Sequence, residues 1–255
     1  MSAIDQGDIS TDIDEGIGTI EFHHPLSNSL PGKLLGKLAN SISEFGENNE
    51  VRVIVLKSAG DRAFCAGASF DELISIDNLE TGKLFFSGFA NVINAARKCP
   101  KLIIGRVHGK AVGGGVGLAS AVDYCFATEH ASVKLSELAV GIGPFVVGPA
   151  VARKIGDAAM SELTIDAKSW RTADWAKSKG LYADVFPTVE AMDEAISILA
   201  VTLSESNPEA MRELKRIFWE NTDHWDVLLA ERAAISGRLV LSDFTRNAIN
   251  KFKSK

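Results

Sequence analysis

Apolar runs alternate with amphipathic segments over the first half of the chain. Residues 18–22, 51–57 and 102–107 are short apolar runs typical of buried strands, and residues 33–45 carry apolar positions at helical spacing. A further strand is predicted at 123–128, after another helical stretch. Because strands that alternate with helices form parallel sheets with crossover helices, the pattern predicts an α/β fold with a mainly parallel sheet.

The pattern changes after residue 157, where helical periodicity prevails. Helices are predicted at 158–163, 173–179, 189–203, 208–219 and 226–239. We therefore divide the chain into an α/β core domain at 1–157 and a C-terminal helical subdomain at 158–255.

Composition supports one compact unit and restricts the partners. The chain has 255 residues, of which 46% are hydrophobic and 24% charged, which is enough for a substantial core. A net charge of −6 and a pI near 5.5 argue against nucleic acid as a partner. Residues 1–14 are polar, and no run approaches the roughly 18 apolar residues of a membrane span. We expect a cytoplasmic protein without a membrane segment.

Three consecutive glycines stand between the strand at 102–107 and a predicted helix. Gly113, Gly114 and Gly115 can adopt positive φ and let a ligand approach the main-chain N–H groups where that helix begins. The partial positive charge of a helix N-terminus suits an anion or a developing oxyanion. A glycine run before a helix also forms ordinary tight turns, so a second element is needed to indicate a site.

A second loop of small residues supplies that element. The strand at 51–57 leads into Ala66, Gly67 and Ala68, which precede another short helix. Two such loops can each direct one backbone N–H towards the same oxygen atom, which is the geometry of an oxyanion hole. The sequence therefore predicts stabilisation of a developing oxyanion.

Motifs for several other chemistries are absent from the sequence. It contains no GxGxxG, GxxxxGK[ST], HExxH or GxSxG string. Cys65, Cys99 and Cys125 are too few and too scattered for a disulfide framework or a four-cysteine zinc site. We expect buried, reduced thiols and no metal site. His108, at the end of an apolar strand, is expected to bond to the backbone rather than to react.

The two loops resemble segments of a known family. AFCAGAS at 63–69 is similar to the AFxAGAD loop of the crotonase, or enoyl-CoA hydratase/isomerase, superfamily, and HGKAVGGGVGLASAVDY at 108–124 resembles its NGxAxGGGxELAxxCDY segment. The resemblance covers nearly the whole chain. It implies a crotonase-like (ClpP/crotonase) spiral of ββα units with C-terminal helices that assemble homotrimers or dimers of trimers. It also implies that the N–H groups of Ala68 and Gly114 hold the carbonyl oxygen of a coenzyme A thioester.

Departures from the family pattern bear on the reaction. Gly117 stands where the family's hydratases carry a glutamate, whereas Glu137 takes the place of the glutamate in their QPE motif. Phe145 stands where dienoyl-CoA isomerases and chlorobenzoyl-CoA dehalogenases place a catalytic aspartate, which disfavours those two reactions. One base suffices to move a proton from C2 to C4 while an oxyanion hole holds the dienolate. Isomerisation of a 3-enoyl-CoA, with Glu137 as the base, is therefore favoured over hydration.

Alternatives stay open at this point. The chain could be a hydratase of short or branched, methylglutaconyl-type enoyl-CoA, in which Gly117 leaves room for a water or for a carboxylate of the substrate. It could also bind CoA thioesters without turnover, while a thioesterase is disfavoured because no nucleophile and base pair is visible. Glu137 itself could be a solvated carboxylate, as most glutamates are. Its neighbours in sequence are apolar, however, which would raise its pKa and suit a proton shuttle.

The remaining site residues are assigned through the resemblance. The substrate is expected to contact Ala66, Gly67, Phe70, Gly113, Gly117 and Phe145. Its acyl group is also expected to meet Leu73, Phe85, Phe86 and Phe89. The coenzyme A part is expected at Leu26, Asn28, Phe244 and Lys253. No separate cofactor is expected, because coenzyme A arrives as part of the substrate.

Overall fold

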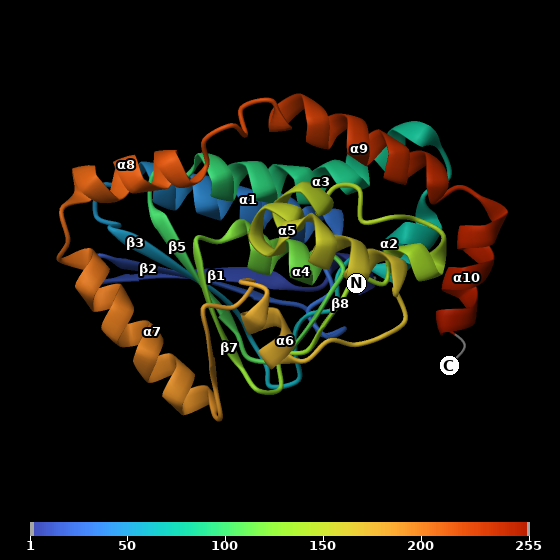
Figure 1. Ribbon diagram of the computed structural model, residues 1–255. Helices are drawn as coiled ribbons and strands as arrows, with labels where there is room; N and C mark the ends of the chain where they lie inside the picture. Colours follow the sequence, from blue (N-terminus) through green and yellow to red (C-terminus); the bar gives the residue numbers. More distant parts are fainter. Residues whose placement is uncertain (1–2, 254–255) are drawn as a thin grey trace.

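A computed structural model describes residues 3–253 of the chain (Figure 1). Its largest element is a six-stranded sheet with the strand order β1-β2-β3-β5-β7-β9. The strands are β1 (Asp8–Asp14), β2 (Ile17–His23), β3 (Val53–Ser58), β5 (Leu102–Val107), β7 (Tyr124–Thr128) and β9 (Asp184–Phe186). β1 and β2 pair antiparallel, and all later neighbours pair in parallel, which confirms the predicted α/β fold class.

A smaller sheet carries the loops that contain the candidate chemistry. It consists of the parallel strands β4 (Ala63–Cys65), β6 (Lys110–Val112) and β8 (Val133–Lys134), in that order. Because neighbouring strands are parallel, the chain leaves all three at the same edge of the sheet. The segments that follow are the end of the AFCAGAS loop, the triple glycine and the stretch that leads to Glu137. The topology thus gathers three distant parts of the sequence.

Two apolar cores lie on opposite faces of the large sheet. The main core includes residues of α1 (Gly32–Glu47), α3 (Leu79–Lys98) and α4 (Gly114–Ala121), and the smaller one is formed with α7 (Val189–Ser204). Side chains alternate between these cores along β3, as the two-residue period of a strand requires. Val53 and Val55 belong to the smaller core, and Ile54 and Leu56 belong to the main core.

The remaining helical segments surround these layers. They are α2 (Phe70–Ser75), α5 (Gly148–Ile165), α6 (Ala173–Ser178), α8 (Pro208–Phe218), α9 (Trp225–Leu239) and α10 (Asp243–Lys253), with the 3-10 turns η1 (Ala3–Asp5) and η2 (Glu137–Val140). The predicted boundary at 157/158 falls inside α5, beside a kink at Gly156. Residues 158–255 are mainly but not purely helical, because β9 pairs with the open edge of β7 and α7 covers one sheet face. The expected trimer concerns other copies of the chain and stays a prediction.

Asp123 ties α8 to the sheet through buried polar contacts. Its Oδ2 accepts hydrogen bonds from the backbone N–H of Ile103 at 2.8 Å and from Nζ of Lys215 at 2.6 Å. Its Oδ1 accepts a hydrogen bond from Nε1 of Trp219 at 2.8 Å. A buried carboxylate needs such partners, since an unpaired charge inside a protein is strongly unfavourable. This cluster therefore holds α8 at the end of β5.

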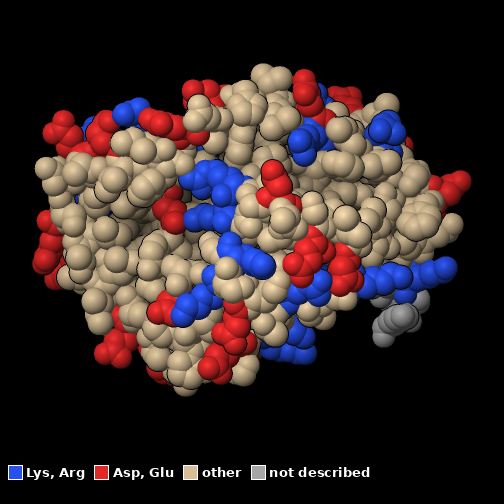
Figure 2. Space-filling model, viewed as in Figure 1, with Lys and Arg blue, Asp and Glu red and all other residues tan. Residues whose placement is uncertain are grey.

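The surface mixes both signs of charge. Figure 2 shows acidic and basic side chains interspersed over one face of the molecule, with basic groups gathered towards its centre. No helix within residues 3–253 is long and apolar enough to cross a membrane.

Candidate active site

The loops after β4 and β6 lie directly against each other. A Cβ atom at Gly67 would lie 2.8 Å from the carbonyl oxygen of Val112, and Gly67 also has a positive φ of 86°. A Cβ atom at Gly115 would lie 2.5 Å from the carbonyl oxygen of Cys65. Both separations are far below the usual contact distance of a carbon atom. Glycine is therefore required at both positions for the loops to approach this closely.

Two backbone N–H groups at this junction lack a backbone acceptor. Leu30 pairs with the residues on either side of Ala68, so that within the described chain the N–H of Ala68 itself donates to no backbone carbonyl. Gly114 is the first residue of α4, and its N–H has no intrahelical acceptor. These are the two N–H groups expected to form the oxyanion hole. Their convergence on one oxygen atom stays a prediction.

Glu137 follows β8 and places its carboxylate over the triple glycine. A Cβ atom at Gly113 would lie 2.9 Å from Oε1 of Glu137. Gly113 precedes α4 with φ 52° and ψ −112°, a conformation that residues with side chains rarely adopt. Glycine at position 113 is thus required both by the backbone and by the space that the carboxylate occupies.

The carboxyl group of Glu137 is buried, and one of its two oxygen atoms has no polar partner within the described residues. Although the residue as a whole keeps some exposure, its Oε2 is buried and accepts no hydrogen bond from the described residues. Burial disfavours the charged form and raises the pKa of Glu137 from 4.5 to about 7. A carboxyl group with such a pKa exchanges protons readily near neutral pH, which suits a general base.

A mainly apolar cavity of about 60 Å³ lies beside this carboxylate. Ala68, Gly113, Gly114 and Glu137 all line it, so the expected oxyanion donors and the expected base reach one cavity. The aromatic and aliphatic part of the wall includes Phe70, Leu73, Phe86, Phe89 and Phe145, all of which were expected at the acyl group.

Phe85 is an exception among the expected acyl contacts. It is not part of the cavity wall, and its ring packs edge-on against Phe86 at 5.2 Å and against Phe89 at 6.1 Å between ring centroids. Adjacent residues of a helix point in different directions, and Phe85 instead lines a separate pocket together with Leu84 and Gly88. The expectation that Phe85 contacts the acyl group is therefore wrong for this arrangement.

A wider groove of about 1070 Å³ adjoins the cavity. Phe70, Ser136 and Val140 line both spaces. The groove is bordered by aromatic and basic side chains, namely Trp170, Phe244, Lys134, Lys168 and Lys251. Nζ of Lys134 and Nζ of Lys110 each lie 5.2 Å from the ring centroid of Trp170, within the range of cation–π attraction. Such a surface suits a ligand that combines an aromatic ring with phosphate groups.

Known proteins match both the sequence and the fold. The family model for enoyl-CoA hydratase/isomerase matches residues 12–248. The chain belongs to the enoyl-CoA hydratase/isomerase family. It is 28% identical to the mitochondrial enoyl-CoA hydratase of Pongo abelii, over 91% of this chain and 77% of that protein. The structure of enoyl-CoA hydratase from Bacillus halodurans shares the fold, with a TM-score of 0.88 at 18% identity, over 95% of this chain and 99% of that one.

Relatives in the enoyl-CoA hydratase/isomerase family carry both kinds of name. The chain is also 26% identical to the mitochondrial Delta(3,5)-Delta(2,4)-dienoyl-CoA isomerase of Pongo abelii, over 80% of this chain and 66% of that protein. Membership in the family confirms the resemblance and the crotonase-like fold. Membership does not distinguish hydration from isomerisation, so that distinction must be argued from the residues of the cavity.

Gly117, a position expected to distinguish reactions within the enoyl-CoA hydratase/isomerase family, is separated from the cavity by Val147. A Cβ atom at Gly117 would overlap Cγ1 of Val147, and Val147 lines the cavity whereas Gly117 does not. Val147 stands just before α5, which packs on α4 and brings this side chain over the glycine. The expectation that Gly117 leaves room for a water or a substrate carboxylate is therefore wrong.

Introducing glutamate at this position tests the packing. Gly117→Glu alone is expected to lower the free energy of unfolding by about 1–3 kcal/mol, because the added side chain overpacks against Val147. In a Val147→Gly background, Gly117→Glu should lower the free energy of unfolding by less than it does in the wild type, because Val147 no longer opposes the added side chain. Urea unfolding of the four proteins measures both effects. A single variant as stable as the wild type would contradict this packing.

Asn28 and Leu26, which were expected to contact coenzyme A, differ in exposure. Asn28 is buried, and its Nδ2 donates to the carbonyl oxygens of Ala59 and Ala63 at 2.8 and 2.9 Å. Both donors of that amide group are thus used within the protein, which holds the loop after β2 in place. Leu26 is 49% exposed at the surface of the same loop. A direct contact of either residue with coenzyme A stays a prediction, and for Asn28 the structure assigns the amide another role.

For two further expected contacts, Ala66 and Lys253, contact with the substrate stays a prediction. The N–H of Ala66 donates to the carbonyl oxygen of Ser27 at 3.1 Å, so it holds the two loops together. Lys253 ends α10, and its side chain lies outside the described part of the chain.

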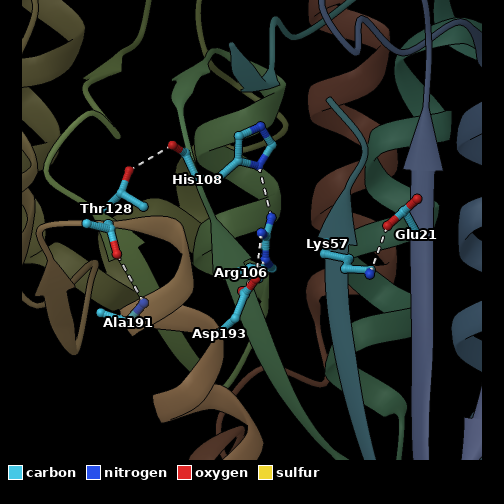
Figure 3. Close-up of polar contacts among 8 residues, drawn as sticks. Glu21, Lys57, Arg106, His108, Thr128, Ala191 and Asp193 are labelled. Atoms are coloured by element: carbon cyan, nitrogen blue, oxygen red, sulfur yellow. Dashed lines mark hydrogen bonds and ion pairs between the residues drawn. The ribbon is translucent and has the colours of Figure 1, made fainter. Parts of the chain in front are cut away.

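His108 lies away from the cavity, among polar groups on the large sheet (Figure 3). Its Nδ1 contacts a guanidinium nitrogen of Arg106 at 3.3 Å, and Arg106 also pairs with Asp193 of α7. The backbone carbonyl oxygen of His108 accepts a hydrogen bond from the Thr128 hydroxyl at 2.7 Å. Burial and the neighbouring Arg106 lower the pKa of His108 to about 4, so the ring is neutral at pH 7. The structure thus gives His108 a packing role.

The three cysteines are buried and free, which confirms the expectation from their spacing. Burial raises the pKa of Cys65 to about 12, so this residue of the first loop is a thiol rather than a nucleophilic thiolate. Within residues 3–253, no group of three or more His, Cys, Asp or Glu side chains could hold a metal ion.

The cavity wall also contains residues that the sequence did not indicate. Val147 and Ser236 both line it, and Ser236 comes from α9, far along the chain from the loops. No local pattern points to Ser236, because only the packing of α9 against α3 brings it to the site.

Proposed function

We propose that the chain is a Δ3,Δ2-enoyl-CoA isomerase that acts on short 3-enoyl-CoA esters with Glu137 as its single base. One observation carries the proposal. The cavity wall, as far as it is described, combines one buried carboxylate with two N–H groups that lack backbone acceptors, and it holds no second carboxylate. Water addition usually recruits a second acid or base, and Val147 fills the space beside Gly117 where one was expected.

In the proposed reaction, the thioester oxygen accepts hydrogen bonds from the N–H groups of Ala68 and Gly114. These bonds stabilise the negative charge that develops on oxygen when Glu137 removes a proton from C2. The resulting dienolate then takes the same proton from Glu137 at C4. The double bond has moved from C3–C4 to C2–C3, and neither water nor a net proton is consumed.

The groove beside the cavity is proposed to hold coenzyme A. Its adenine would lie against Trp170 or Phe244, and its phosphates would lie near Lys134 and Lys168, all of which border the groove. The thioester would then sit where the groove meets the cavity. A cavity of about 150 Å³ admits benzene, so the 60 Å³ found here favours short acyl groups.

Product analysis tests the proposal directly. Purified protein is incubated with 3-butenoyl-, 3-pentenoyl- and 3-hexenoyl-CoA and, separately, with short and branched 2-enoyl-CoA esters, and the products are separated by chromatography and mass. The expected product is the 2-enoyl isomer without a gain in mass. Addition of one water to a 2-enoyl ester would instead favour a hydratase, the activity in the name of one relative. No conversion of any ester would favour a protein that binds CoA thioesters without turnover.

The pH dependence of the rate is a further expected result. The base must be deprotonated to act, and burial raises the pKa of Glu137 to about 7. We expect kcat/KM to rise about tenfold per pH unit below pH 6 and to level off above pH 8. Initial rates at low substrate concentration between pH 5 and 9 measure this profile. A rate that is constant from pH 5 to 8 would argue against Glu137 as the base.

A further inference from the structure

One wall of the cavity presents a hydroxyl group from helix α9. Ser236 lines the cavity but not the adjoining groove, and only 1% of the residue is exposed. Its hydroxyl makes no hydrogen bond to the described residues, and its oxygen is not among their fully buried unpaired atoms, so it is open to the cavity. Several other helical hydroxyls bond to the preceding turn, as Ser120 does to the carbonyl oxygen of Val116 at 2.8 Å and Thr202 to that of Ile198 at 2.8 Å. Ser236 therefore keeps its hydrogen-bonding capacity for the cavity.

The position of Ser236 is fixed by the pairing of α9 with α3. At the next residue, a Cβ atom at Gly237 would lie 2.5 Å from the backbone nitrogen of Lys83, so the two helices are in direct backbone contact there. Near the other end of the pair, a guanidinium nitrogen of Arg97 bonds to Asp226 at 3.0 Å. Contacts at both ends set the register of the antiparallel helices. The orientation of Ser236 towards the cavity follows from that register.

The surroundings of Ser236 define what its hydroxyl can recognise. The wall near it is apolar and includes Phe86, Phe89 and Val147, while Glu137 is the only charged side chain of the described lining. An acyl group in the cavity would cover this hydroxyl, and a covered hydroxyl without a partner is unfavourable, so a ligand atom that bonds to it is favoured over a methyl group. A carboxylate would find no cation in this wall and would be repelled by Glu137. The hydroxyl thus suits a neutral oxygen atom.

We propose that Ser236 selects short acyl groups that carry a hydroxyl or carbonyl oxygen at the end remote from the thioester. The inference rests on the proposed action on CoA thioesters, since Ser236 and the proposed base Glu137 line the same cavity. Ser236 then determines specificity without taking part in the proton transfer. Acyl groups of the same size that end in a methyl group leave the Ser236 hydroxyl unpaired.

Binding of two saturated esters tests the inference without any reaction. 4-Hydroxybutanoyl-CoA and pentanoyl-CoA have the same number of heavy atoms and differ only in a hydroxyl or a methyl at the end. Calorimetric titration into wild type and Ser236→Ala should show about tenfold weaker binding of the hydroxyl ester to the variant, because its hydroxyl would be buried unpaired. The Kd of pentanoyl-CoA should change less than about twofold. The control Ser120→Ala, outside the cavity, should alter neither value.

The outcomes separate this inference from the proposed function. If Ser236→Ala changes both affinities equally, or changes neither, the role of Ser236 is overturned while CoA-thioester binding stands. If neither ester binds to the wild type, the proposed function fails and the inference fails with it. Should circular dichroism show that Ser236→Ala does not fold, Ser236→Cys replaces it. A thiol is a weaker hydrogen-bonding group, so the same selective loss is expected, smaller in size.

Discussion

Replacing Glu137 with glutamine is expected to lower kcat/KM for 3-enoyl-CoA isomerisation by about two to four orders of magnitude. The amide keeps the shape of the side chain but cannot remove a proton from C2. Because the oxyanion donors and the cavity wall are unchanged, the affinity for a saturated acyl-CoA should stay within about threefold of the wild type. Steady-state kinetics and calorimetry measure the two quantities separately.

A matched carboxylate serves as the control. Glu72 is half-buried, and burial also raises its pKa, but it accepts a hydrogen bond from the N–H of Gly32 at 2.7 Å and is not part of the cavity wall. Glu72→Gln keeps that acceptor and should retain the wild-type rate. Full activity of Glu137→Gln would contradict the single-base mechanism, and equal losses in both variants would indicate a structural effect.

The same substitution should change stability in a pH-dependent way. Burial raises the pKa of Glu137 from 4.5 to about 7, so the folded protein favours the neutral form. The contribution of the neutral Glu137 side chain to the free energy of unfolding is complete below pH 4.5 and is lost as the pH rises through about 7. Glu137→Gln should therefore match the wild type near pH 4 and exceed its free energy of unfolding by roughly 3 kcal/mol at pH 8. Urea unfolding at both pH values checks the sign.

Removing the N–H of Gly114 is expected to lower kcat by about two to three orders of magnitude. Proline has no N–H and is tolerated as the first residue of a helix, which is where Gly114 stands. A Cβ atom at Gly114 would overlap the ring of Phe89, so the substitution is made in a Phe89→Ala background. The expected loss corresponds to the removal of one hydrogen bond from the developing oxyanion.

Gly114→Ala in the same Phe89→Ala background is the matched control. It adds a Cβ atom but keeps the N–H, so its kcat should stay close to that of Phe89→Ala alone. The ratio between the proline and alanine variants then isolates the contribution of the N–H. Equal kcat values in the two variants would show that the N–H of Gly114 does not stabilise the transition state.

Most long elements of the fold were predictable from the sequence. The strand predicted at 18–22 is β2 (Ile17–His23), and the helix predicted at 189–203 is α7 (Val189–Ser204). Both carry a regular apolar pattern because one side of each is buried. β1 (Asp8–Asp14) was not predicted, since it is a polar edge strand with only Ile9 and Ile13 packed against the core.

Local motifs indicated the loops of the site but not the wall around them. The two loops were found because glycine-rich turns have recognisable signatures, and the family resemblance then singled out Ala68, Gly114 and Glu137, all of which line the cavity. Val147 against Gly117 was not foreseen, because that contact depends on how α5 packs on α4. Phe85 was misplaced for a related reason, since helical periodicity predicts a buried face but not the cavity that the face borders.

The sequence alone determined the α/β class, the family and the segments that carry the candidate chemistry. These depend on local periodicity and on short motifs, in which neighbouring residues already hold the information. Only the tertiary structure decided which side chains share the cavity, that Val147 covers Gly117, and that Ser236 of α9 lines the cavity. Such contacts join residues far apart in the chain, and they are set by close packing between helices rather than by any pattern within one of them.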